Sequence, residues 1–139
     1  MASLTRTSLA KLASEKRRDA RLLLAGGRWA SAYYFYGLTV EVAIKAVIAR
    51  GILAETVSER GFSNAFYSHK LTDLVGLAGL KDDLVARLGD AQFKGNWDVV
   101  QGWTVDARYE EIAKDRAEAI ARAVDDRTNG VFKWLTSHW

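Results

Sequence analysis

The chain of 139 residues contains no cysteine and no proline. Without cysteine it can form no disulfide and carries no thiol nucleophile, and the redox state of its compartment is left open. Without proline it lacks the residue that most often kinks or breaks a helix. These two absences exclude a disulfide-stabilised scaffold and favour long, uninterrupted helices.

Several functional signatures are missing as well. The sequence holds only two histidines and no P-loop, G-x-G-x-x-G, H-E-x-x-H or nucleophile-elbow motif. Its longest uncharged run, Trp29–Val40, is short of the ~20 residues that span a bilayer. The first 21 residues are charged throughout and carry no secretory hydrophobic core. We therefore expect a cytoplasmic protein with no metal, no cofactor and no membrane span.

Apolar residues recur at helical spacing along most of the chain, and no segment alternates with a period of two. Two long helices are predicted, one from Thr5 or Thr7 to Ala25 and one over 29–50, with glycines at 26, 27 and 51 as stops. After an irregular stretch over 52–67, shorter helices are expected after a Ser68 cap, around Leu84, after an Asn96 cap, and from about Tyr109 to the end with an interruption at 129–130. The fold class is therefore all-α, in one domain over 1–139.

The segment Ala32–Lys45 is almost entirely apolar but carries Glu41 and Lys45, four residues apart. A helix that is apolar around most of its circumference must be buried on several sides, so this one is predicted to be the central helix of a bundle. Its two charges then form either a structural ion pair or a ligand-facing pair. Its double apolar stripe also predicts a dimer interface formed by the first two helices.

Positive charge is concentrated at the N-terminus. Residues 1–28 hold seven bases and two acids, a local balance of +5, whereas the remaining residues hold thirteen bases and fifteen acids, a balance of −2. A basic first helix attracts a phosphate backbone or an acidic protein surface. The simpler interpretation, which we favour, is a solvated face that keeps the protein soluble. The candidate nucleic-acid contacts are Lys16, Arg17, Arg18 and Arg21.

Three groups of residues together resemble a known superfamily. They are G-x-x-x-E-x-x-x-K at Gly37, Glu41 and Lys45, then F-Y-S-H-K-L over 66–71, then W-x-x-V-x-x-W-x-x-D-x-R-Y over 97–109. Their order and spacing in an all-helical chain of this size are similar to those of the HEPN superfamily (higher eukaryotes and prokaryotes nucleotide-binding domain). The resemblance covers about residues 15–139.

The resemblance implies an antiparallel four- to five-helix bundle that commonly forms a homodimer. Some members are ribonuclease toxins, and others are proposed to bind nucleotides or RNA beside a nucleotidyltransferase partner. The ribonuclease members carry R-x(4–6)-H, which this chain lacks. His69 follows Arg60 by nine residues and His138 follows Arg127 by eleven, and only Lys133 stands five residues before a histidine.

The candidate ligand-binding residues are Glu41, Lys45, His69, Arg108 and Tyr109. His69 is either a helix-start histidine bonded to backbone or a phosphate-contacting or proton-transfer group near Glu41. Arg108 either docks against Glu41 or Asp106, with Tyr109 stapling the next helix, or grips an anion while Trp97 or Trp103 stacks on a base.

The sequence thus predicts a non-catalytic HEPN-like module that binds RNA, a nucleotide or a protein partner such as a nucleotidyltransferase, with no catalytic residue assigned. Two alternatives stay open. One is a metal-independent endoribonuclease of the toxin type that uses a combination such as Arg108 with His69. The other is a structural subunit of a helical assembly.

Overall fold

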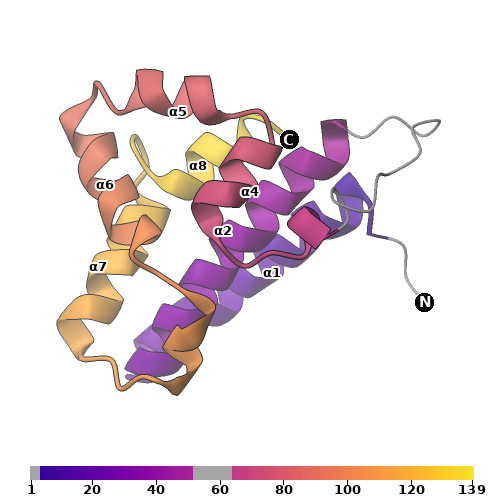
Figure 1. The fold of residues 1–139 in the computed structure, drawn as a ribbon. Coiled ribbons are helices and arrows are strands. Elements are labelled where there is room, and N and C mark those ends of the chain that lie inside the picture. The colour runs from indigo at the N-terminus through magenta and orange to yellow at the C-terminus, as the bar shows by residue number, and fades with distance from the viewer. Residues whose placement is uncertain (1–3, 52–63) are drawn as a thin grey trace.

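The computed structural model describes residues 4–51 and 64–139, which are helical with no strand. The all-α prediction is confirmed for these residues. The elements are α1 (Arg6–Ala25), α2 (Trp29–Gly51), α4 (Leu71–Leu77), α5 (Lys81–Arg87), α6 (Ala91–Gln101), the 3₁₀-helix η1 (Val105–Tyr109), α7 (Lys114–Asp125) and α8 (Val131–Thr136) (Figure 1).

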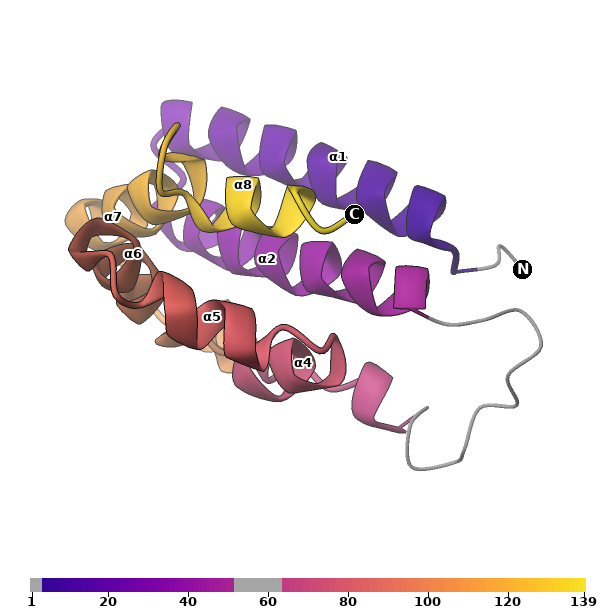
Figure 2. The same cartoon turned by 90° about the horizontal axis from the view of Figure 1, so that it is seen from above.

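The helices α1 and α2 form an antiparallel hairpin that runs the length of the molecule (Figure 2). Thr5 caps α1 in a reciprocal capping box with Ser8, which satisfies backbone donors at the helix start. At the other end Gly27 adopts a φ of 74°, a left-handed conformation that glycine tolerates best, and the chain reverses there. The predicted bounds of both helices are confirmed.

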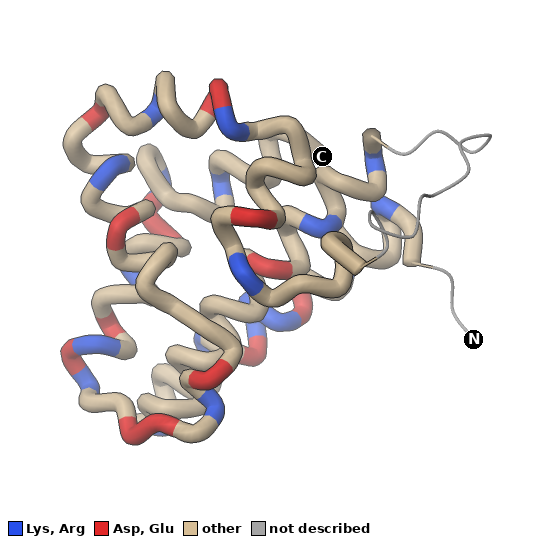
Figure 3. Tube along the Cα trace, in the orientation of Figure 1, with Lys and Arg blue, Asp and Glu red and all other residues tan. Residues whose placement is uncertain are grey.

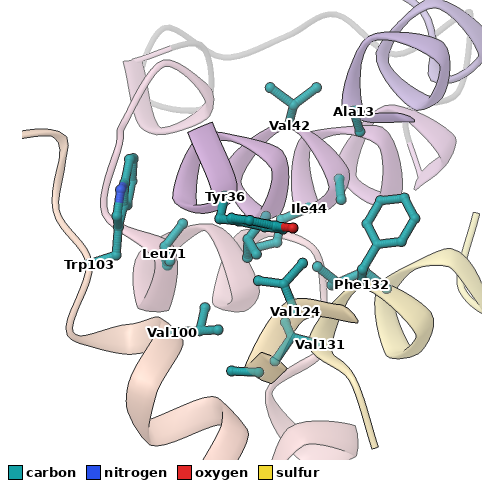
Figure 4. Packing of buried hydrophobic residues seen from close by; sticks show 14 of the residues in the cluster. Ala13, Tyr36, Val42, Ile44, Leu71, Val100, Trp103, Val124, Val131 and Phe132 are labelled. Atoms are coloured by element: carbon teal, nitrogen blue, oxygen red, sulfur yellow. The ribbon is translucent and has the colours of Figure 1, made fainter. Parts of the chain in front are cut away.

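The helix α2 lies at the centre of the fold, as predicted. It packs against α1, α4, η1, α7 and α8, and Figure 2 shows it between α1 and the row formed by α4, α5 and α6. By length and composition α2 could also cross a membrane, but 78% of its most apolar window is buried inside the fold. It is therefore accounted for as a core helix (Figure 4).

The helix over residues 91–101 is capped by Asp90, whose carboxylate accepts from the backbone N–H groups of Gln92 and Phe93. The prediction of Asn96 as a cap was wrong, because the helix starts earlier and thereby buries Phe93 completely. Asn96 instead donates from its side chain to the backbone oxygen of Asn129. Similarly, Ser68 does not cap α4; its hydroxyl accepts from the N–H of Lys70, the residue immediately before the helix.

The C-terminal region is divided more finely than predicted. A 3₁₀ turn over 105–109 and an extended residue, Glu110, precede α7, so no helix begins at Tyr109. The predicted interruption at 129–130 is confirmed. There the carboxylate of Asp126 accepts from the backbone N–H groups of Thr128 and Asn129, which diverts the chain from helical geometry.

The apolar surface of α2 is fully covered by the same chain in the second half of the helix. From Thr39 to Ile48 every residue of this helix is buried. In its first half, Tyr34, Phe35 and Leu38 are only half-buried, so α2 keeps some accessible apolar surface. Dimerisation through the first two helices stays a prediction.

Gly37 sets the distance between α2 and the segment that precedes η1. The indole of Trp103 lies directly on this glycine, and a Cβ built there would overlap the ring. Trp103 is 2% exposed, and its Nε1 finds no hydrogen-bond partner among the described residues. Packing against α2, rather than a hydrogen bond, therefore holds this indole in place (Figure 4).

We expect Gly37→Ala to lower the free energy of unfolding by about 3 kcal/mol or more, because the ring and α2 must move apart. The matched control is Gly95→Ala in α6, where a Cβ meets nothing within 4 Å. That change should be neutral or stabilising by up to about 1 kcal/mol. Urea denaturation of both variants checks the pair, and equal midpoints would refute the close approach at Gly37.

Candidate functional site

Three of the predicted site residues form one cluster on α2 and the segment before α4. The Glu41 carboxylate receives Lys45 Nζ at 3.3 Å on one oxygen and His69 Nδ1 at 2.8 Å on the other. Glu41 is 3% exposed and Lys45 is 7% exposed. A carboxylate buried to this extent is stable only when it is paired and hydrogen-bonded, and here each oxygen has its own donor.

The ion pair between Glu41 and Lys45 is thus a structural contact. Lys45 Nζ also lies 5.4 Å from the centre of the Phe66 ring, so the ammonium has a second favourable neighbour. Both charged side chains are almost fully covered by the protein.

His69 is the exposed member of the cluster, with 53% of its side chain accessible. The interpretation of a backbone-bonded histidine was wrong, because its ring contacts the Glu41 carboxylate. Since a carboxylate accepts, this contact places a proton on Nδ1 and leaves Nε2 for another partner. His69 also borders a pocket of about 370 Å³ that Ser68, Thr72, Gln101 and Trp103 help to line.

Arg108 and Tyr109 lie apart from this cluster. The Arg108 guanidinium stacks 4.8 Å from the Tyr109 ring centre, and among the described residues it pairs with neither Glu41 nor Asp106. Tyr109 is 78% exposed, so it does not staple α7. Arg108 borders a different hollow, of about 220 Å³, beside Tyr34 and Phe35.

The indoles expected to stack on a base cannot do so. Trp97 and Trp103 are each 2% exposed, which leaves no ring face for a ligand. The predicted combination of Arg108 with Trp97 or Trp103 as an anion-and-base pocket was therefore wrong. The structure likewise does not bring Arg108 and His69 to one pocket.

A second cluster, which the sequence did not predict, centres on Asp125 at the end of α7. Its carboxylate accepts from Arg17 Nε at 2.6 Å, Arg21 Nε at 3.2 Å and the Tyr36 hydroxyl at 2.9 Å. Burial, and then the charge of Asp125, raise the pKa of Tyr36, so this phenol stays a donor. Asp125 thereby ties α1, α2 and α7 together (Figure 1).

Two adjoining hollows open on either side of Asp125, and we call them together the Asp125 groove. The larger, of about 800 Å³, reaches Trp29, and the smaller, of about 450 Å³, reaches Phe132. Four residues line both hollows: Arg21, Asp125, Asp126 and Arg127. The charged residues that line the groove are the bases Arg17, Arg21, Lys114, Arg122, Arg127 and Lys133 and the acids Glu118, Asp125 and Asp126.

The groove therefore carries a surplus of three positive charges. Figure 3 shows that acidic and basic positions are interspersed around α7, so the surplus is local rather than spread over a whole face. Of the acids, Asp125 is already held by three donors. Backbone hydrogen bonds from Asn129 and Thr128 lower the pKa of Asp126 and keep it ionised. Arg122 and Arg127 form no ion pair within the described part of the chain.

The four predicted nucleic-acid contacts on α1 are separated by the structure. Arg17 and Arg21 line the Asp125 groove, whereas Lys16 and Arg18 do not. Lys16 Nζ lies 5.4 Å from the Phe35 ring centre on another side of α1. Arg18 is exposed. The partner of Arg17 and Arg21 could not be predicted from the sequence, because Asp125 is 108 and 104 residues away along the chain.

Comparisons with known proteins add no assignment: no family model matches the chain, and neither the curated proteins nor the solved structures give a match.

We expect Glu41→Ala to lower the free energy of unfolding by roughly 3–5 kcal/mol, because it leaves the buried Lys45 ammonium without its counter-charge. The matched control is Asp98→Ala, which breaks an exposed ion pair of the same spacing, Lys94 to Asp98 at 2.9 Å. That change should cost less than about 1 kcal/mol. Denaturant melts measure both, and an unchanged melt for Glu41→Ala would contradict the structural role of the pair.

Proposed function

We propose that this chain is a HEPN-like module that binds RNA without cleaving it. The HEPN-like part rests on the ordered motif residues. In support, Glu41, Lys45 and His69, which belong to two separate motifs, meet in one contact cluster. Trp103 of the third motif packs on Gly37 of the first. These contacts join residues of the three motifs across the fold, as an antiparallel bundle of the HEPN type would require.

The RNA-binding part rests on the Asp125 groove. Six bases and three acids line it, and two of the bases, Arg17 and Arg21, are held in place by a fixed carboxylate. A positively charged groove with an aromatic side chain is what non-specific single-strand binders use. Arginine is suited to phosphate because its planar guanidinium offers parallel donors.

Single-stranded RNA should bind the wild-type protein with a steep dependence on salt. Each phosphate contact releases condensed counterions, so log K should fall against log salt with a slope of about −0.7 per contact. Fluorescence anisotropy with a labelled oligoribonucleotide across a salt series measures the slope, and a gel of the same samples should show intact RNA. No binding at about 50 mM salt would contradict the proposal.

Two arginine variants locate the contact. Arg127→Gln removes a groove charge that makes no hydrogen bond to Asp125, and it should weaken binding and reduce the slope by about 0.7. Arg18→Gln removes the same charge from an exposed position that does not line the groove and should change both quantities less. A larger loss of binding in Arg18→Gln than in Arg127→Gln would show that the RNA contacts α1 outside the groove. Competition by a free nucleotide, or capture of a nucleotidyltransferase in place of RNA, would favour those ligands instead.

The contact between His69 and Glu41 favours a second candidate, a metal-independent endoribonuclease. His69 Nε2 would accept the proton of a 2′-hydroxyl, the freed 2′-oxygen would attack the adjacent phosphorus, and the 5′-oxygen would leave with a proton from the ammonium of Lys70, which lines the same pocket. The gel described above distinguishes the two functions. Cleavage that is abolished by His69→Gln and retained in Arg127→Gln would establish this candidate in place of the non-catalytic one.

A further inference from the structure

Arg17 and Arg21 use only part of their hydrogen-bonding capacity. Each donates its Nε to Asp125, at 2.6 and 3.2 Å, and neither donates from its Nη atoms to any described residue. Arg17 is also positioned from the other side, because its guanidinium lies 4.6 Å from the Phe132 ring centre. Two guanidinium groups are therefore held by their inner nitrogens while their outer nitrogens are left for another acceptor.

The two ends of the Asp125 groove differ in chemistry. At the Phe132 end, a hollow of about 450 Å³ is lined by four bases, Arg17, Arg21, Arg127 and Lys133, and by two acids, Asp125 and Asp126. At the Trp29 end, the hollow of about 800 Å³ has apolar walls from Leu24 and Ala121 beside the half-buried indole. One end therefore suits an anion, and the other suits a flat, largely apolar group.

Lys114 covers part of the Trp29 ring, with Nζ 5.7 Å from the ring centre. Its side chain is 67% exposed, and its contact with Glu118 is long, at 4.0 Å. A planar ligand can displace so weakly held a side chain from the ring. The amine would then lie close enough to the groove to face a phosphate.

We infer that the Asp125 groove holds one nucleotide of single-stranded RNA in two parts, with the base stacked on Trp29 and the adjoining phosphate on the outer nitrogens of Arg17 and Arg21. This inference rests on the proposed RNA-binding function and adds the placement of the base. The bound nucleotide must be unpaired, because a base inside a duplex exposes no face to an indole. Trp29 is the aromatic residue that the predictions overlooked, since Trp97 and Trp103 are buried.

The test compares two probes of equal length and charge, a labelled single-stranded oligoribonucleotide and the corresponding abasic ribose-phosphate oligomer. Wild-type protein should bind the base-bearing probe about 5- to 150-fold more tightly, the range that base–aromatic stacking supplies. In Trp29→Leu this ratio should fall toward one, and Trp29→Phe should keep part of it. Tyr67→Leu, which removes an exposed aromatic ring outside the groove, should leave the ratio unchanged.

Tryptophan fluorescence gives a second readout. Stacking on Trp29 should quench part of the emission of the wild-type protein, and the quench should be lost in Trp29→Phe. Equal binding of both probes by the wild-type protein would overturn the placement of the base and leave RNA binding intact. Binding of neither probe would instead remove the proposed function itself. Because the abasic comparison uses unmodified protein, it stands even where Trp29→Leu fails to fold.

Discussion

The enclosure of α2 is the constraint on which the rest of the structure depends. This helix is apolar around its circumference, so α1, α4, η1, α7 and α8 must all contribute a covering face. Close packing follows from the same requirement, because the indole of Trp103 reaches α2 only where Gly37 presents no side chain. The short helices of the second half are individually too short to be stable alone, and they are ordered by the surface they cover.

The polar groups that α2 does carry mark the two candidate sites. Tyr36, in its first half, donates to Asp125, and Glu41, in its second half, accepts from Lys45 and His69. The Tyr36 hydroxyl and the Glu41 carboxylate are each satisfied by residues from another element or the next turn, as a low-dielectric interior requires. Around each of these contacts the chain leaves a hollow, a basic one beside Asp125 and a smaller one beside His69.

Local features were predictable from the sequence, and long-range pairings were not. The bounds of α1 and α2 follow from Thr5 and the glycines, and the proximity of Glu41 to Lys45 follows from helical spacing. The proximity of His69 to Glu41 was offered only as one alternative. The link from Arg17 to Asp125 spans 108 residues, and no local pattern reveals it. For Arg108, the short motif suggested a contact with Glu41 or Asp106. In the structure Arg108 lies in a 3₁₀ turn over 105–109 and stacks on Tyr109 instead.

The central functional claim is that RNA occupies the Asp125 groove rather than the pocket beside His69. Side-chain ¹H–¹⁵N spectra test it most directly, since the Nε–H groups of Arg17 and Arg21 and the indole N–H of Trp29 each give a separate signal. Titration with single-stranded RNA should shift these three signals and leave the ring signals of His69 and the indole signal of Trp103 in place. Shifts confined to His69 and Trp103, with Arg17 and Arg21 unmoved, would contradict the account.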